Sequence, residues 1–192
     1  MAASAAPYGA KPIGTLSASG SFTGKVQHIK IASGYDTLIS WGDFVKLVAA
    51  GTIEKDAGTT TATPVGVFMG CSYTDPTTSQ PTYAQMWTAD VAASDAMAYV
   101  LTDPNVLFQM QGDGAITQAM LGSNFAIVVT AGSTTIGHSK NAVDQSTSAT
   151  TNTLPLRIVD YVDGPDSAVG DAYTDVIMKF NVGHQYVNTT GI

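Results

Sequence analysis

The chain has 192 residues, of which 44% are hydrophobic. This is enough for one domain that folds without a disulfide or a metal ion. Only 12% of the residues are charged, about half of the usual share of roughly 25%. The net charge is −7, the few lysines are scattered, and Arg157 is the only arginine. Binding to nucleic acids or anionic membranes needs clustered basic side chains, so we expect neither. A surface with so few charges is typical of proteins that pack against other subunits.

The acidic residues favour strands and turns over helices. Glu54 is the only glutamate, and all the other acids are aspartates. Aspartate is common in turns and at helix ends, whereas glutamate suits helix interiors. The many threonines favour strands. We therefore predict a mainly β fold: a single-domain antiparallel β-sandwich or β-barrel, with a β-tulip-like arrangement also compatible, carrying an extended N-terminal arm and one or two short helices.

The first part of the chain, residues 1–24, consists mostly of small residues with isolated apolar ones between them. We interpret it as an extended arm that precedes a β-rich domain of residues 25–192. Its apolar residues are the candidate contacts with a partner, and they are Tyr8, Ile13, Leu16 and Phe22. The start of the chain lacks the charged and apolar regions of a secretory signal. No apolar run is long enough for a transmembrane helix.

Short apolar runs between turn residues predict the strands of the domain. In chain order these strands are expected at residues 25–32, 37–41, 65–73, 83–89, 96–102, 106–111, 125–130, 154–162 and 176–182. The segment 44–50 fits either a short helix capped by Asp43 or a strand. The turn Asp103-Pro104-Asn105 predicts a hairpin-like arrangement of the strands on either side of it.

Three further segments are expected outside the strands. Residues 115–121 carry apolar side chains at helical spacing, which predicts a short helix that Gly122 ends. Residues 144–153 are almost wholly polar and predict a surface loop. Residues 163–171 contain Gly164-Pro165 and Gly170, which predict another loop.

No catalytic or metal-binding motif is recognisable. His28, His138 and His184 lie far apart in the sequence, and Cys71 has no partner. Five aspartates between Asp160 and Asp175 are expected to be solvated turn residues; a calcium site is the alternative, but the EF-hand spacing is missing. We therefore expect a protein that is not an enzyme and has no cofactor, although catalytic residues can also converge through folding.

Five segments match, in order, a pattern known from small phage head proteins. They are Tyr8-Gly9-Ala10-Lys11-Pro12, Gly42-Asp43-Phe44-Val45-Lys46-Leu47, Pro64-Val65-Gly66-Val67-Phe68, the stretch from Ala98 to Gly114, and Leu154-Pro155-Leu156-Arg157-Ile158-Val159. In this respect the chain resembles the capsid decoration proteins of tailed phages, also called cement or head-stabilisation proteins, which are encoded beside the major capsid protein. Ala10 departs from the pattern, because an aromatic residue is usual there.

The resemblance implies a structural virion protein that binds the exterior of an icosahedral capsid and cements neighbouring subunits. Its partners would be the major capsid protein and further copies of itself, as a trimer or, second, a dimer. It would be made in the cytoplasm of the bacterial host. The alternatives are a head-fibre or tail-tube subunit and a carbohydrate-binding β-sandwich. A carbohydrate binder needs exposed aromatic rings, whereas Trp41 and Trp87 are expected in the core.

Overall fold

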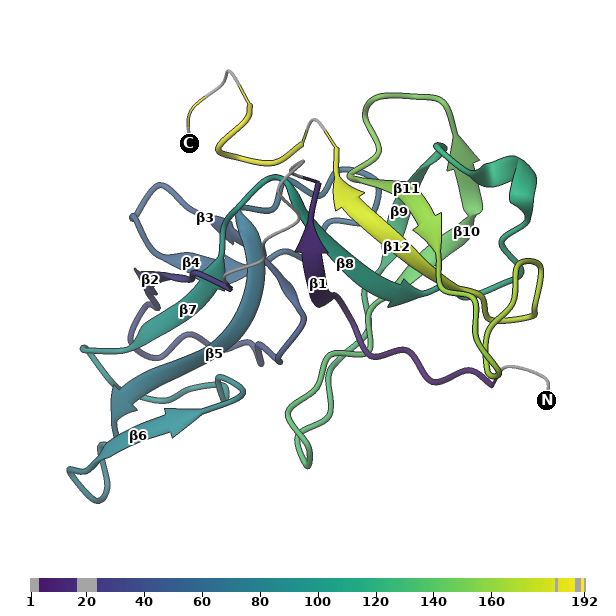
Figure 1. Cartoon of the computed structure of the whole chain (residues 1–192). Coiled ribbons are helices and arrows are strands. Elements are labelled where there is room, and N and C mark those ends of the chain that lie inside the picture. Colours follow the sequence, from purple (N-terminus) through teal and green to yellow (C-terminus); the bar gives the residue numbers. More distant parts are fainter. Residues whose placement is uncertain (1–3, 17–23, 182, 189–190, 192) are drawn as a thin grey trace.

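The computed structural model describes residues 4–16, 24–181, 183–188 and 191, and Figure 1 shows that its regular elements are almost all β-strands, joined by long loops. They form two antiparallel sheets. In spatial order, sheet A consists of β1 (Lys11–Thr15), β8 (Val106–Gln111), β12 (Asp175–Phe180), β11 (Leu156–Tyr161), β9 (Asn124–Val128) and β10 (Ala142–Ala149). Sheet B consists of β2 (Gln27–Lys30), β7 (Met97–Leu101), β5 (Gly66–Thr74), β3 (Phe44–Leu47) and β4 (Ile53–Lys55), while β6 (Pro81–Ala84) pairs with the far end of β5. The predicted mainly β fold is confirmed.

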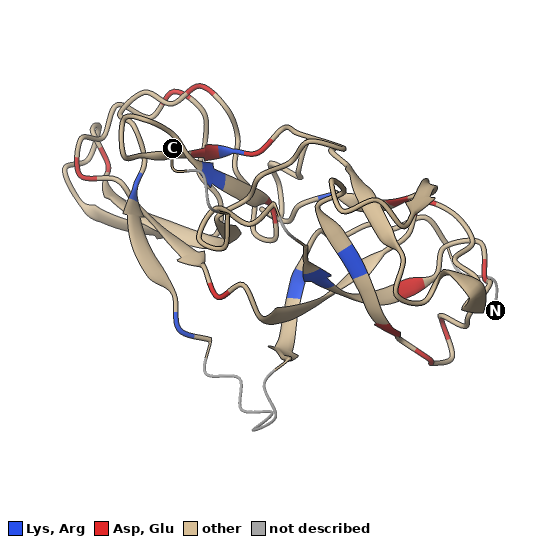
Figure 2. Ribbon diagram, turned by 90° about the horizontal axis from the view of Figure 1, so that it is seen from above, with Lys and Arg blue, Asp and Glu red and all other residues tan. Residues whose placement is uncertain are grey.

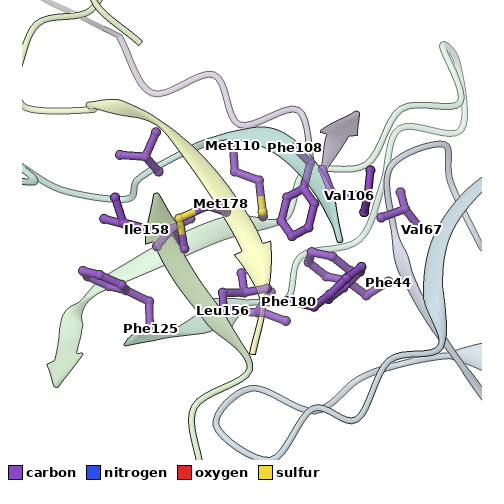
Figure 3. Packing of buried hydrophobic residues seen from close by; sticks show 14 of the residues in the cluster. Phe44, Val67, Val106, Phe108, Met110, Phe125, Leu156, Ile158, Met178 and Phe180 are labelled. Atoms are coloured by element: carbon purple, nitrogen blue, oxygen red, sulfur yellow. The ribbon is translucent and has the colours of Figure 1, made fainter. Parts of the chain in front are cut away.

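Sheet A encloses the larger hydrophobic core. Along β8 and β12 every second side chain is buried, because successive side chains of a strand point to opposite faces. Figure 3 shows these side chains converging with those of β9 and β11. Phe108 and Phe180 lie at the centre, with ring centroids 5.0 Å apart. The sheet is strongly curled, so that an isolated bridge between Gly112 and Val143 joins the end of β8 to β10.

Sheet B has its own core, but one of its strands also contributes to the first. Its buried residues include Phe68, Cys71 and Trp87. From β3, Val45 points into this core, whereas the adjacent Phe44 packs in the core of sheet A. The Phe44 ring lies edge-on to Phe108 and Phe180, with centroids 5.6 and 5.7 Å apart. β3 therefore joins the two cores, and the segment 44–50 contains a strand instead of the alternative helix.

Several predictions about local structure are wrong. The predicted strand at 37–41 contains only isolated bridges at Ile39 and Trp41. The predicted loop 144–153 largely belongs to β10. One of its polar side chains also holds the neighbouring strand β9, because Thr147 Oγ1 accepts the backbone N–H of Ala126 at 2.9 Å. β7 and β8 do not form a hairpin, because β7 pairs with β2 and β5 while β8 pairs with β1 and β12. The turn at 103–105 carries the chain from sheet B to sheet A. The predicted helix at 115–121 is a single 3-10 turn, η1 (Gln118–Met120).

The boundary between an extended arm of residues 1–24 and a β-rich domain that begins at residue 25 does not hold for the described part of this segment. Residues 11–15 form β1, which pairs with β8, with a bulge between Pro12 and Gly14. Ala10 is fully buried. Further towards the N-terminus, the side chain of Gln111 hydrogen-bonds to the backbone of Ser4 and Ala6. The described residues before position 17 are thus packed on sheet A, because the backbone pairs with β8 even though its side chains do not alternate.

Candidate binding surface

The four predicted contact residues have different environments. Ile13 and Leu16 are 41% and 48% exposed. They lie in and just after β1, the edge strand of sheet A. Tyr8 is half-buried and precedes β1, while Phe22 lies outside the described residues. The structure therefore places Ile13 and Leu16 where a partner can reach them, and Tyr8 close to the body of the protein.

The outer face of sheet A carries three of the few basic residues. Phe108 and Met178 point into the core, so their neighbours in sequence point outwards. On this outer face Lys179 pairs with Arg157 of β11 across one strand boundary and with Leu107 of β8 across the other. Figure 2 shows basic residues on adjacent strands, whereas most acidic residues lie in loops.

Two acidic residues, Asp160 and Asp175, share this outer face with the three basic ones, because Asp160 pairs with Ile177 and Asp175 alternates with Ile177 along β12. Lys11 lies on the same face, because it pairs with Gln109, which pairs in turn with Ile177. Asp175 of β12 is the acid close to Lys11, and burial raises the pKa of its carboxyl group. We call the side chains of Lys11, Leu107, Arg157, Ile177 and Lys179 the sheet A outer face. Its mixture of aliphatic and basic groups suits an acidic or neutral protein surface.

A buried carboxylate holds the surrounding loops in place. Asp43 is completely buried and forms an ion pair with Lys55, with a distance of 2.9 Å between Nζ and Oδ2. The backbone N–H of Ser40 donates to Oδ2 at 2.8 Å. Ser139 Oγ and Asn141 Nδ2 both donate to Oδ1. We call these five residues the Asp43 network. Each carboxylate oxygen has two partners, which offsets the cost of burying the charge.

The Asp43 network joins segments that are distant in the sequence. The backbone N–H of Ala10 donates to Gly42 O, and the N–H of Gly42 donates to Phe68 O, both at 2.9 Å. Gly9 has a φ of +75°, and a Cβ at this position would lie only 2.4 Å from Ser139 Cβ. A side chain larger than hydrogen therefore does not fit there. The N-terminal segment, β3, β5 and the loop before β10 are held together at this point.

The structure separates the ionisable residues that were considered, from the sequence, as metal ligands. Among the described residues no group of three His, Cys, Asp or Glu side chains is placed to hold a metal ion. Asp175 accepts a hydrogen bond from Gln109 Nε2, whereas Asp171 accepts one from the backbone of Ala168. The described aspartates of this stretch therefore do not gather around one point at which a calcium ion could bind. Cys71 is buried, and burial raises the pKa of its thiol to about 12.

His184, which the sequence offered only as an isolated histidine, is buried. Its ring packs on Phe180, with centroids 4.9 Å apart. The backbone N–H of Tyr186 donates to Nδ1, which assigns the ring hydrogen to Nε2. Nε2 is buried, and the backbone of Val65 lies beside the ring. Burial lowers the pKa of His184 from 6.5 to about 4. The neutral ring fits the site, and a protonated ring does not.

Mild acid should therefore destabilise the protein through His184. Between about pH 6.5 and pH 4 the unfolded chain binds a proton that the folded chain does not. The stability from the neutral ring is complete above this window and is lost as the pH falls through it. At pH 5 the loss should be about 2 kcal/mol. Urea denaturation at pH 7 and pH 5 measures it, with His184→Gln as the control. If His184→Gln loses as much stability as the parent chain, His184 is not responsible.

No described helix is long and apolar enough to span a membrane. No protein-family model matches the chain, and neither a curated protein nor a solved structure matches it.

Proposed function

We propose that this chain is a structural virion protein that binds the outer surface of a tailed-phage icosahedral capsid. There it cements neighbouring subunits of the major capsid protein and stabilises the head. The observation that carries this proposal is that the five segments resembling decoration proteins build one continuous framework.

The contacts within this framework are direct. The first segment meets the second where Ala10 N–H donates to Gly42 O. The second meets the third where Val65 N–H donates to Val45 O at 2.7 Å. The fourth segment contains β7 and β8, which pair with β5 and β1. The fifth contains the start of β11, whose Leu156 lies in the same core as Phe108. All five segments thus serve the fold, which supports a structural role.

The sheet A outer face and the exposed edge at Ile13 and Leu16 are the proposed contact with the shell. Burying an aliphatic side chain of this size contributes on the order of 1.5–3 kcal/mol before ordering costs. The basic side chains of Lys11, Lys179 and Arg157 add attraction to acidic groups of the partner. Such a contact needs no catalytic residue and repeats identically on every shell subunit.

Self-association on the shell is part of the proposal, with a trimer as the expected form and a dimer as the alternative. Closed symmetry is the rule for homo-oligomers. An icosahedral shell also offers many three-fold and local three-fold positions. With 12% charged residues, the surface has little charge repulsion to oppose contacts between copies.

Reversing charges on the sheet A outer face should weaken binding to capsids that lack this protein. We expect Lys11→Glu combined with Lys179→Glu to raise the Kd roughly tenfold, because four units of charge change at the contact. Co-sedimentation with such capsids at moderate salt measures this. The matched control is Lys25→Glu with Lys30→Glu, which makes the same charge change beside β2 in sheet B. If both double variants bind equally well, the outer face of sheet A is not the contact.

The alternative phage roles differ in where the chain would be found. A head-fibre subunit would occur in few copies at particular positions of the head, such as a vertex. A tail-tube subunit would occur in the tail, in stacked copies. Neither would cover the whole shell. Fractionating virions into heads and tails separates these roles from decoration.

A further inference from the structure

A pocket with an aromatic wall lies at one end of the sheet A outer face. Its volume is about 310 Å³, which is enough for one sugar ring. It is lined by Tyr8, Lys11, Trp41, Gln109 and His138. Trp41 is only partly buried, in contrast to the fully buried Trp87. The expectation that both tryptophans belong to the core is therefore wrong for Trp41.

The aromatic wall is preformed. The rings of Trp41 and His138 lie with their centroids 5.2 Å apart and their planes 34° from each other. The backbone keeps them adjacent, because Trp41 N–H donates to Gly137 O at 2.8 Å and Ser139 N–H donates to Trp41 O at 2.9 Å. Ser139 also belongs to the Asp43 network. A ligand that packs on these rings would meet them already in position, which lowers the entropic cost of binding.

The opposite side offers both donors and acceptors. Lys11 and Gln109 are paired across β1 and β8. Gln109 Nε2 donates to Asp175 Oδ2 at 3.2 Å, which leaves the amide oxygen of Gln109 as an acceptor. The hydroxyl of Tyr8 lies beside Asp175 and Gln109. Yet this hydroxyl and Asp175 Oδ1 are buried and form no well-oriented hydrogen bond within the described residues.

We propose that this pocket binds one ring of a neutral carbohydrate. The C–H face of a sugar ring packs on flat aromatic rings, and its hydroxyl groups each donate and accept hydrogen bonds. The pocket matches both properties. Lys11 disfavours a cationic ligand, and Asp175 disfavours an anionic one, so a neutral polyol fits best. This binding goes beyond capsid decoration and does not depend on it.

The test is a titration of the full-length protein with glucose, galactose, mannose and N-acetylglucosamine, each followed by NMR of the tryptophan indole N–H groups. For at least one sugar, the Trp41 signal should shift and saturate with a Kd in the millimolar range. The signal of Trp87 should stay in place, because that residue is fully buried in the core of sheet B. Trp87 thus serves as an internal control.

Variants locate the site. Gln109→Ala and Trp41→Ala should each weaken binding roughly tenfold or more, with the Gln109 variant followed by the Trp41 signal and the Trp41 variant by calorimetry. Gln109→Ala removes an amide without disturbing the aromatic wall, so it remains informative if Trp41→Ala does not fold. The control is Tyr83→Ala, which removes an aromatic ring that is 78% exposed on β6, outside the pocket.

Two results would overturn the proposal. One is the absence of a saturable shift of Trp41 with all four sugars at about 0.1 M. The other is sugar binding that Gln109→Ala and Trp41→Ala leave unchanged. Capsid binding is measured separately with the lysine variants of the outer face, so either proposal can fail without the other.

Discussion

Replacing Asp43 with alanine should lower the free energy of unfolding by about 3–5 kcal/mol. The substitution leaves the ammonium group of Lys55 in a site where its side chain is only 8% exposed, without its carboxylate partner. It also removes the acceptor for Ser40 N–H, Ser139 Oγ and Asn141 Nδ2. An unpartnered buried charge is among the most destabilising changes known for single substitutions.

Urea denaturation followed by circular dichroism measures this effect at pH 7, above the range in which His184 titrates. The matched control is Asp166→Ala, which removes an exposed carboxylate from the loop between β11 and β12 and should change stability by less than about 0.5 kcal/mol. A loss below about 1 kcal/mol for Asp43→Ala would show that the ion pair and its hydrogen bonds contribute little.

Deleting residues 2–20 should destabilise the whole protein by roughly 4 kcal/mol or more, out of the 5–15 kcal/mol typical of a domain. The deletion removes β1 and exposes the edge of β8. It also removes the buried Ala10 and the hydrogen bonds from the backbone of Gly9 and Leu16. Each such bond contributes on the order of 1 kcal/mol, and each buried apolar side chain adds to this.

Deleting only residues 2–5 is the control for this truncation, because it leaves β1 and Ala10 in place and removes the hydrogen bond from Gln111 Nε2 to Ser4 O. Thermal unfolding should then occur close to the temperature of the full chain. If the longer deletion melts at the same temperature as the full chain, β1 adds nothing to stability, and residues 1–24 are an extended arm outside the domain, as the sequence predicted.

The strands that could be predicted are those whose side chains alternate between core and surface. Val106–Gln111 is one, because its apolar residues recur at every second position. β10 was missed because most of its side chains are polar and show no alternation with apolar ones; its pairing with β9 makes it a strand. β1 was missed because it contains Pro12 and Gly14, which are rare in strands and here flank a bulge.

The candidate sites were harder to predict than the strands. Asp43 was considered as a helix cap, whereas its partners include Ser139 and Asn141, almost a hundred positions away. The pairing of Trp41 with His138 likewise depends on the folded backbone. Sequence patterns reveal the local spacing of residues. Both of these contacts join residues about a hundred positions apart, so no local pattern indicates them. Ile13 and Leu16, by contrast, were selected for being isolated apolar residues, and the structure leaves both exposed.

A reconstruction of purified virions by electron cryomicroscopy tests the proposed capsid role most directly. The proposal predicts hundreds of copies of this chain on the outer surface of the head, grouped in threes, with β1 and the sheet A outer face towards the shell. Isolated copies that each bridge two shell subunits would contradict the trimer alone. A head whose outer surface carries no density for this chain would contradict the proposed function itself.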